Sequence, residues 1–531
     1  MNARASAGAI QRRRVDADPT LVYKIASEPC EFEQIHHLNY RTFVEEIPQH
    51  PANDSGLLQD RYHDQNTYFI CLRGSELIGM ISISDQRPFS LDKKLPRLDD
   101  FLPAGRKSIC EIRLLSIQRR DRGGQILRRL VQMVAERVIA GGYNLVIFSA
   151  TVRQLKLYRH LGAVPFGPEV GTEGASYQPM YILPEKFVIA HPVNFLPGPV
   201  AVPEAVERAF FEAPVSHRSA EFHRLLAETK TLLKKLVHAG QVEVFVGSGT
   251  LANDIVAGQL TLLRRPGVIL SNGEFGDRLI DHAGRWKIDC EAVRIPWGAA
   301  YSEKTIERIL DRHQDAAWVW AVHCETSTGV LNDLEMLQRI CASRRIRLCL
   351  DCVSSIGTVP VDLRGVYLAS GASGKAICGY PGLSMVYFNH KIAPRPRDLP
   401  RYLDLGYAAA NDGVPFTHSS NLVSALHAAL LDFRPDFAYT RVARLSQCLR
   451  ASLEQSGHEI VAPSSIASPA VITIRLPAED DSRRIGVRLR DQGILVGFES
   501  VYLVERNWIQ IYLTRYTKSS AVERFVHALR F

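Results

Sequence analysis

Between about residues 240 and 390, short apolar runs alternate with segments of helical periodicity, and this order constrains the fold more than any other feature of the chain. The apolar runs cover residues 243–246, 268–270, 292–296, 318–323, 347–351 and 383–388. Helical patterns lie between them, for example over residues 303–312 and 334–344. Such alternation predicts an α/β fold with a mostly parallel sheet and helices on both of its faces.

The flanking regions have patterns of their own. We expect a disordered tail at residues 1–19, an α/β unit at 20–187, and a proline-rich linker with an N-terminal arm at 188–199. The alternating domain then occupies residues 200–430, and a smaller α+β domain occupies 431–531. In the first unit, strands are predicted at residues 66–72, 77–84, 111–117 and 144–150, with a helix at 125–140.

Composition narrows the cellular setting and the class of partner. Apolar residues make up 46% and charged residues 23%, as in a soluble globular protein. The net charge of +8 is mild and no basic patch is interleaved with aromatic residues, so neither nucleic acid nor a membrane is an expected partner. Ten scattered cysteines and the absence of a secretory signal favour the cytoplasm. Cys349 and Cys352 lie in an apolar run and are expected to be buried thiols, not metal ligands.

A glycine turn near residue 248 joins a predicted strand to the start of a predicted helix. The sequence there is Phe-Val-Gly-Ser-Gly-Thr-Leu-Ala-Asn, from Phe245 to Asn253. Backbone N–H groups and the helix dipole at such a turn point toward an anion, for example a phosphate. An ordinary structural turn explains this short motif equally well.

Two further residues complete a pattern that pyridoxal phosphate (PLP) requires. Asp351 ends an apolar strand, and a buried carboxylate needs a partner such as a protonated pyridine nitrogen, although it could also cap the next turn. Lys375 lies 24 residues later, alone among glycines and small residues, where a Schiff base with the cofactor would form. Phosphate turn, acid and lysine in this order predict a PLP site at the carboxyl ends of the strands.

Residues 192–531 resemble the class V aminotransferases, PLP enzymes of fold type I. Three motifs carry the resemblance: Asn-Phe-Leu-Pro-Gly-Pro at 194–199, Ser-His-Arg-Ser-Ala-Glu-Phe at 216–222 and His-Cys-Glu-Thr-Ser-Thr-Gly-Val at 323–330. The resemblance implies a seven-stranded sheet, a small C-terminal domain, and a homodimer with active sites at its interface. It also implies a small-molecule amino donor and a keto or aldehyde acceptor.

The same resemblance assigns roles to individual residues. The phosphate would be bound by Gly249, Thr250, Leu251, Ser373 and, from the partner subunit, Thr417. Phe275 would stack on the ring, and Val353 would cover its opposite face. Thr326 would reach the ring hydroxyl, and Asp351 would face the ring nitrogen. His217 and Arg218 would lie near the substrate entrance.

One position departs from the family's pattern. Many relatives bind the substrate α-carboxylate with an arginine in a strand of the small domain, where a bidentate guanidinium fits. The matching strand here is Trp-Ile-Gln-Ile-Tyr-Leu-Thr-Arg from 508 to 515, and Gln510 stands in that place. Either Arg515 or Arg506 replaces the missing arginine, or the amine substrate is not a simple α-amino acid.

Residues 20–187 resemble the GCN5-related N-acetyltransferase (GNAT) superfamily, including its autoinducer-synthase-like branch. The resemblance rests on Cys-Glu-Ile-Arg-Leu-Leu-Ser-Ile at 110–117, on the following Arg120-Asp121-Arg122-Gly123-Gly124 turn, and on residues 154–163. Backbone N–H groups of Gly123 and Gly124, with Arg122 and its neighbouring arginines, would hold the pyrophosphate of coenzyme A. Gln125 stands where the family has a small residue, so the match is partial.

Amine attack on a thioester needs a base, an oxyanion donor and an acid. Glu111 is the candidate base, the strand at 114–116 offers the N–H donor, and Tyr158 is the candidate acid. Three alternatives remain: Glu111 pairs only with Arg113 or a neighbouring strand, Tyr158 is core packing, or the whole unit has lost catalysis.

The leading hypothesis is a bifunctional biosynthetic enzyme, a PLP-dependent aminotransferase fused to an N-acyltransferase that uses acyl-CoA or an acyl-carrier protein. The alternative is a PLP-dependent lyase of the same fold, joined to a non-catalytic GNAT-like domain that senses acyl-CoA.

Overall fold

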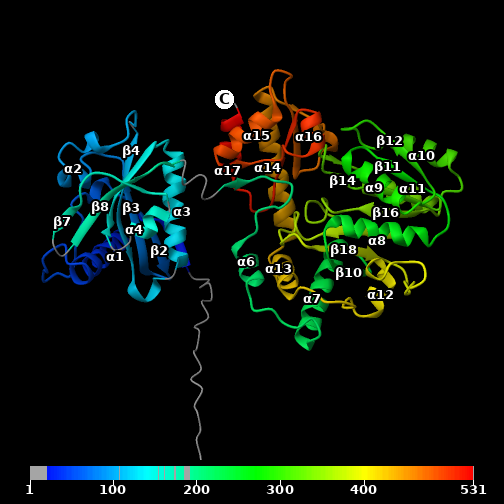
Figure 1. The fold of residues 1–531 in the computed structure, drawn as a ribbon, viewed down its shortest axis with the longest axis horizontal. Coiled ribbons are helices and arrows are strands. Elements are labelled where there is room, and N and C mark those ends of the chain that lie inside the picture. Colours follow the sequence, from blue (N-terminus) through cyan, green and yellow to red (C-terminus); the bar gives the residue numbers. More distant parts are fainter. Residues whose placement is uncertain are drawn as a thin grey trace, which may run out of the picture. The chain divides into compact units, whose positions relative to one another are not determined.

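The computed structural model describes residues 21–106, 108–122, 124–152, 155–160, 162–172, 175–184 and 192–529. The chain divides into two compact units, Met1–His191 and Pro192–Phe531 (Figure 1). The boundary falls inside the segment expected to be a linker. The tail expected at residues 1–19 lies outside the described residues.

The first unit is built on one mixed sheet. Its strand order is β1-β2-β3-β4-β5-β8-β6, with β7 paired to β8. The strands are β1 (Leu21–Ile25), β2 (Thr67–Arg73), β3 (Glu76–Ser84), β4 (Ile109–Ile117), β5 (Leu145–Thr151), β6 (Val164–Pro165), β7 (Val170–Thr172) and β8 (Ala175–Ile182). β4 and β5 run parallel, whereas the other pairs in the sheet are antiparallel.

Helices cover both faces of this sheet. They are α1 (Pro29–Tyr40), α2 (Ser90–Lys94), α3 (Gly124–Ala140) and α4 (Leu155–His160), and a π-helical turn (Arg41–Glu46) follows α1. Buried residues of α3, such as Leu130 and Val134, pack against one face of the sheet at Phe69 and Ile81. α1 packs on the opposite face, with Ile35 in the cluster formed there.

β4 and β5 separate along their length. They pair only from Ile109 to Glu111 and from Leu145 to Ile147, although both strands continue further. β4 also has an irregular register against β3, where Ile81 opposes Leu115 but Ile83 opposes Ile112. The extra residue makes a bulge, which re-aims backbone groups next to the gap between the strands.

The second unit contains a seven-stranded sheet in the order β10-β18-β17-β16-β13-β11-β12. The strands are β10 (Gln241–Val246), β11 (Gly267–Ser271), β12 (Cys290–Arg294), β13 (Trp318–Val322), β16 (Arg347–Asp351), β17 (Leu368–Ala372) and β18 (Leu383–Phe388). β18 runs antiparallel to both neighbours, and the remaining pairs are parallel. This architecture confirms the predicted α/β fold.

Helices lie on both faces of the seven-stranded sheet, as Figure 1 shows. They are α6 (Glu204–Phe210), α7 (Ala220–Val237), α8 (Gly249–Thr261), α9 (Glu274–Arg285), α10 (Glu303–Arg312), α11 (Leu334–Ser343), α12 (Leu405–Ala410) and α13 (Ser420–Leu431). α7, α11 and α13 contribute to one core cluster, and α8 and α9 contribute to another on the other face. A short hairpin of β14 (Cys324–Glu325) and β15 (Val330–Leu331) follows β13.

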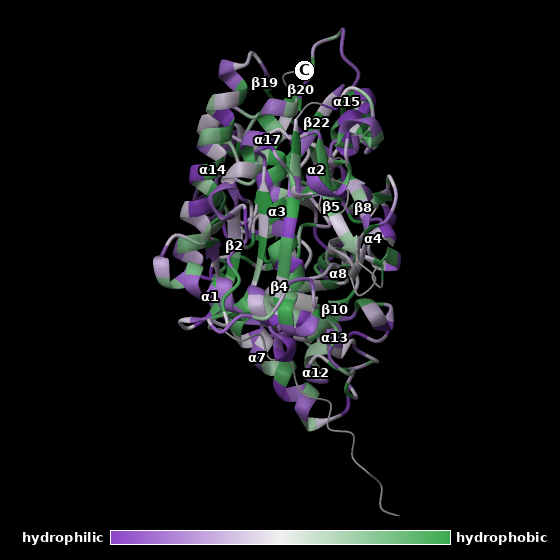
Figure 2. Ribbon diagram, turned by 90° about the vertical axis from the view of Figure 1, so that its left-hand side faces the viewer, coloured by the Kyte–Doolittle hydropathy of each residue, from purple (hydrophilic) through white to green (hydrophobic). Residues whose placement is uncertain are grey.

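The C-terminal part forms a small α+β subdomain. Its strands are β19 (Glu459–Ile460), β20 (Val471–Arg475), β21 (Ile494–Leu495) and β22 (Trp508–Tyr512), and its helices are α14 (Pro435–Gln455), α15 (Ser482–Asp491), α16 (Val501–Glu505) and α17 (Ser519–Leu529). α14 carries hydrophobic and hydrophilic residues along its length (Figure 2). β9 (Val193–Asn194), from the expected linker, pairs with β21, and Phe195 is buried in the subdomain's core.

None of the helices in the described part of the chain is both long and apolar enough to cross a membrane.

Candidate functional site

In the second unit, the candidate cofactor residues follow the carboxyl ends of four strands. Gly249 follows β10, Phe275 follows β11, Asp351 ends β16, and Lys375 follows β17. Because these four strands run in the same direction, their carboxyl ends share one edge of the sheet. The fold therefore brings together residues that are far apart in the sequence.

The turn before α8 is tightly packed against the loop after β16. Ser248 precedes the helix, which begins at Gly249. A Cβ built on Gly249 would lie 2.8 Å from Cγ2 of Val353, so a larger residue would displace the loop. The first N–H groups of a helix have no partner within the helix and favour an anion. The turn thus forms a cradle that fits a phosphate, with Thr250 exposed beside it.

Asp351 is buried and has fixed hydrogen-bond donors. Its Oδ2 accepts a bond of 2.8 Å from Asn253 Nδ2, and its Oδ1 accepts one of 2.9 Å from the Val353 N–H. Burial raises the pKa of Asp351, while these two donors act to lower it. A buried carboxyl of this kind is suited to a cationic partner that it can hold in one orientation.

Lys375 lies in the loop after β17, close to the N-terminal arm. Burial lowers the pKa of Lys375 to about 8, while Asp351 is near enough to oppose this shift. The amine lies 6.0 Å from the ring centre of Tyr512. A Cβ built on Gly198 would lie 3.7 Å from Lys375 Nζ. An amine with such a lowered pKa is a better nucleophile near neutral pH than an ordinary lysine.

Glu325 is a buried group that the sequence pattern does not single out. Its carboxylate accepts hydrogen bonds from the backbone N–H groups of Phe275 and Gly276 at the start of α9, and from Ser327. Burial raises the pKa of Glu325 to about 7. The carboxylate fixes the first turn of α9 and with it the Phe275 ring. The acid inside the 323–330 motif was the only signal in the sequence.

Two hydroxyls predicted to reach the cofactor have protein partners. The Thr326 hydroxyl donates to Ser354 Oγ over 2.5 Å. The Ser373 hydroxyl donates to the carbonyls of Tyr380 and Leu383, within the β17–β18 connection. Ser373 therefore has a structural function in that loop whatever else it contacts.

Gln510 and Arg515 are both buried and both engaged with the protein. The Gln510 amide donates to Thr326 O at 2.5 Å, Thr473 Oγ1 at 2.8 Å and Ser327 O at 3.3 Å. These bonds use both amide hydrogens, so Gln510 has none to offer a substrate. Arg515 donates to three backbone carbonyls, of which two directly follow Lys375.

Arg506, the second arginine that could bind the substrate carboxylate, contacts an aromatic ring instead of backbone carbonyls. Its guanidinium carbon lies 3.7 Å from the ring centre of Trp297, in a stacked cation–π contact. His217 is half-buried, and Arg218 and Thr417 are exposed. The structure of one chain does not bring these last three residues to Lys375 through any direct contact among the described residues.

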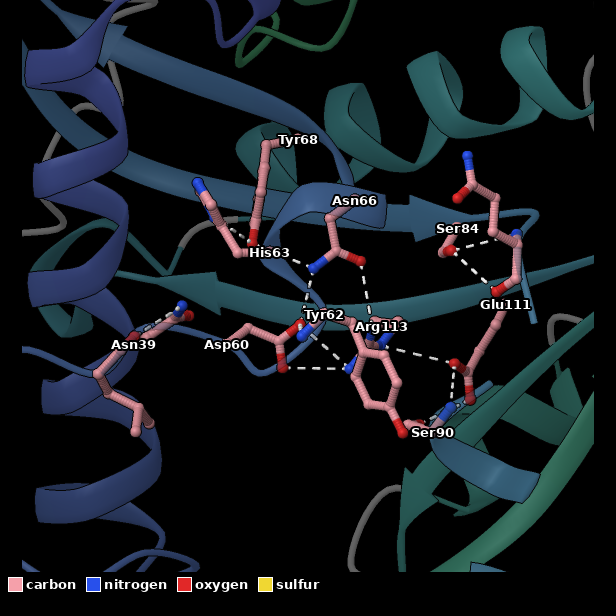
Figure 3. A network of polar contacts seen from close by, with 12 residues as sticks. Asn39, Asp60, Tyr62, His63, Asn66, Tyr68, Ser84, Ser90, Glu111 and Arg113 are labelled. Atoms are coloured by element: carbon pink, nitrogen blue, oxygen red, sulfur yellow. Dashed lines mark hydrogen bonds and ion pairs between the residues drawn. The ribbon is translucent and has the colours of Figure 1, made fainter. Parts of the chain in front are cut away.

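In the first unit, Glu111 of β4 has a buried carboxylate that contacts the start of α2. It accepts hydrogen bonds from the Ser90 N–H at 2.8 Å, the Ser90 hydroxyl at 2.6 Å and the Leu91 N–H at 3.1 Å (Figure 3). Arg113 lies 3.5 Å away. Burial raises the pKa of Glu111. The expected pairing with Arg113 is present, and so is a raised pKa that a general base requires.

A polar network surrounds Arg113 on the same face of the sheet. Its guanidinium donates to Asp60 at 3.1 Å and Asn66 at 3.3 Å, and it stacks on Tyr62 at 4.1 Å (Figure 3). Asn66 in turn donates to Asp60 and to the Tyr68 hydroxyl. Sequence reasoning missed this network because Asp60 and Tyr62 come from a segment without periodicity, and nothing at Asn66, the first residue of a predicted strand, indicated these partners.

The predicted coenzyme A turn lies only partly within the described residues. α3 begins at Gly124, and Gly123 lies outside them. Arg122 donates to the Ile117 carbonyl at 3.0 Å and to Glu46 at 2.5 Å. Tyr158 lies in α4, with its ring 5.3 Å from that of Phe148, and burial raises its pKa. A tyrosine that stays protonated can serve as an acid.

The residues of the second unit fit PLP. The Gly249 turn offers a helix N-terminus for a phosphate, and Asp351 is a buried acid that lacks a cation in hydrogen-bond contact among the described residues. Lys375 is an amine with a lowered pKa near that acid. These are the three groups that PLP requires.

Comparison with known proteins gives two matching family models. The Aminotransferase class-V model matches residues 207–399, and the Acetyltransferase (GNAT) domain model matches residues 38–132. The soluble hydrogenase small subunit of a Synechococcus species is 33% identical over 295 residues, which are 52% of this chain and 77% of that protein. The L-aspartate–glyoxylate aminotransferase of Paracoccus denitrificans is 30% identical over 315 residues, 55% of this chain and 78% of that protein.

A solved structure gives the same result. The alanine–glyoxylate aminotransferase of a Nostoc species superposes with a TM-score of 0.59 and 26% identity, covering 64% of this chain and 94% of its own.

Proposed function

The chain belongs to the class V aminotransferases, PLP-dependent enzymes, and on this premise we propose that it is bifunctional, with an N-acyltransferase in its first unit. The observation that carries the aminotransferase part is the shared sheet edge of Lys375, Asp351 and the Gly249 turn. The family model over residues 38–132 and the gap between β4 and β5 support the acyltransferase part.

In the aminotransferase unit, each residue has a specific task. When bound, PLP supplies an electron sink for charge at the substrate Cα. Lys375 Nζ binds the cofactor and moves the Cα proton, and Asp351 holds a proton on the ring nitrogen. The N–H groups of Gly249 and Thr250 bind the phosphate beside Leu251, whose own N–H donates to the Ser248 carbonyl at 2.9 Å, and Phe275 and Val353 enclose the ring.

The substrate carboxylate needs a donor other than Gln510. Both amide hydrogens of Gln510 and most donors of Arg515 are used within the protein. The side chain of Arg506 makes no hydrogen bond or ion pair with the described residues, so its guanidinium N–H groups are free for an anionic substrate group. His217, Arg218 and the partner subunit's Thr417 would join the site in a homodimer, an arrangement that we propose together with a cytoplasmic location.

In the acyltransferase unit, the thioester would enter between β4 and β5. N–H groups of β4 beyond Glu111 have no ladder partner on β5 and can stabilise the oxyanion. Glu111 takes the ammonium proton, Tyr158 protonates the departing thiolate, and Arg122 with the Gly123–Gly124 turn binds the donor's pyrophosphate. The donor is acyl-CoA or an acyl-carrier protein.

A second candidate is a PLP-dependent lyase with an acyl-CoA-sensing first unit. The Gln510 amide, whose hydrogens are all bonded within the protein, favours the lyase, because the resemblance implies that ordinary transamination uses an arginine at this position. One experiment separates the two. The full chain with PLP is given candidate amino acids and acyl-CoAs, the pyridoxamine absorbance is followed, and the products are identified by mass spectrometry. A pyridoxamine form together with an amide product supports bifunctionality, whereas cleavage without any pyridoxamine form supports the lyase.

A further inference from the structure

The backbone that follows Lys375 forms a tight turn with one unfavourable residue. The Cys378 N–H donates to the Lys375 carbonyl at 2.8 Å, which closes the turn. Cys378 has a φ of 62°, in the left-handed region that residues other than glycine rarely adopt. Such a conformation persists only where the surroundings hold it in place.

Arg515 holds this turn from outside, in addition to the backbone bond from the Gly379 N–H to the Ser373 carbonyl at 3.1 Å. Its Nη1 donates to the carbonyl of Ala376 at 2.9 Å and to that of Ile377 at 3.1 Å. The side chain is buried and comes from the small subdomain, three residues after the end of β22. A planar guanidinium can meet two adjacent carbonyls at once, which an ammonium group does less well.

The other side of the guanidinium is attached to the large domain. Nη2 donates to the Ala429 carbonyl near the end of α13 at 3.2 Å and lies 3.7 Å from Asp432. The guanidinium also stacks on the rings of Tyr516 and Phe433. A cation at a helix C-terminus is electrostatically favourable. Arg515 therefore joins the lysine loop, α13 and the small subdomain.

The carbonyls around Arg515 account for a charge at this position. Burying a guanidinium is costly, and its carboxylate partner Asp432 is half exposed, so the ion pair offsets little of that cost. An apolar side chain of similar size would leave the carbonyls of Ala376, Ile377 and Ala429 without these donors. The guanidinium therefore fixes the geometry of the carbonyls of residues 376 and 377.

We propose that Arg515 is a positioning residue for the aminotransferase reaction. It fixes the turn from Lys375 to Cys378, so that Lys375 Nζ keeps one position. It also couples the position of this loop to that of the small subdomain. This inference rests on the role of Lys375 in the proposed function. Arg515 acts through the backbone and does not touch the substrate.

The test compares Arg515→Met and Arg515→Lys in the full chain. Arg450→Met is the matched control, because Arg450 is a buried arginine of the same subdomain that donates to a backbone carbonyl, that of Ala462. Hydrogen exchange of a peptide covering residues 375–379 is measured in the cofactor-free chain. The pH titration of the lysine-bound PLP absorbance, kcat and KM are measured with the cofactor.

We expect Arg515→Met to speed exchange in this peptide about tenfold, because the turn opens more often. It should shift the absorbance titration and lower kcat by about 10²-fold with KM nearly unchanged, as small misplacements of a catalytic group do. Arg515→Lys should restore part of each effect. Arg450→Met should change none of them.

Unchanged exchange and titration in Arg515→Met would overturn the proposal, and so would equal changes in Arg450→Met. If Arg515→Met does not fold, Arg515→Lys decides by the same readouts. Failure of the proposed function would give a different result: the wild type would bind PLP at Lys375, but no amino donor would convert the bound cofactor to its pyridoxamine form. The exchange comparison would still decide whether Arg515 positions the loop.

Discussion

The side-chain amide of Gln510 donates a 2.5 Å hydrogen bond to the backbone carbonyl of Thr326. The bond joins β22 of the small subdomain to the turn after β14, which belongs to the large domain. The residue at the position where the resemblance implied a carboxylate-binding arginine is therefore part of the contact between subdomain and domain.

Gln510→Leu should lower the free energy of unfolding of the second unit by about 2–4 kcal/mol, because it leaves buried acceptors without a donor. Urea unfolding of the full chain measures this change. The exposed Gln492→Leu is the control and should cost less than about 0.5 kcal/mol. A raised KM for the amino donor with no loss of stability would show instead that Gln510 binds substrate.

The amine of Lys375 should titrate near pH 8 in the cofactor-free chain, because burial lowers its pKa to about 8. Only the unprotonated amine attacks PLP, so the rate of capture should rise up to about pH 8 and then level off. Stopped-flow absorbance from pH 6 to 10 measures it. A rate that still climbs steeply at pH 10, as for a free lysine amine, would contradict the lowered pKa.

Asp351→Asn should reduce the rate of the half-reaction with an amino donor by about 10²–10³-fold, the size of effect seen when one preorganised electrostatic group is lost. The asparagine keeps the shape of the side chain and should keep PLP bound. Single-turnover absorbance measures the rate. Asp333→Asn is the control, since the Asp333 side chain caps α11 and an asparagine can cap it as well. A comparable loss in this control would point to a general disturbance of the fold.

Glu325 should make the stability of the second unit depend on pH. Its pKa is raised to about 7 from an ordinary 4.5, so the native state holds a proton that the unfolded state has lost. This contribution is complete below about pH 4.5 and is lost as the pH rises through 7. Between pH 5 and 8 the wild type should lose about 2–3 kcal/mol relative to Glu325→Gln. Urea unfolding at both pH values checks it, and parallel pH profiles would refute it.

Glu111→Gln and Tyr158→Phe should each lower the rate of amide formation by about 10²–10⁴-fold if these residues are the base and the acid. Binding of acyl-CoA should stay within about threefold in either variant, since neither group is assigned to the donor. Product mass spectrometry and calorimetry measure the two quantities, with Glu136→Gln on α3 as a control. Full activity in Glu111→Gln would show that Glu111 has only a structural role, through its hydrogen bonds to the start of α2.

Much of the second unit was predictable because its periodicity is strong. The helix expected at 303–312 is α10 (Glu303–Arg312), and the strand expected at 347–351 is β16 (Arg347–Asp351). β17 (Leu368–Ala372) was not predicted as a strand, because its small residues carry little apolar signal. The antiparallel direction of β18 depends on the whole sheet, and local pattern does not encode it.

The site was partly predictable for similar reasons. Asp351 and Lys375 stood out because an acid and a lone lysine lie in apolar or glycine-rich surroundings. The anchoring of α9 by Glu325 and the fork of Arg515 were not predicted, because each joins segments that are distant in sequence. Only the packed fold shows that these charged residues are buried, and burial decides what they contact.

The pairing of β9 with β21 has a consequence for synthesis on the ribosome. Val193 and Asn194 are made about 300 residues before Ile494 and Leu495, their partners in the sheet. The small subdomain cannot close until nearly the whole chain has emerged. The described strands of the first unit pair only among themselves, so this unit can fold while the rest is still being translated. The nascent chain would then acquire the fold of its first unit first and complete its lysine site last.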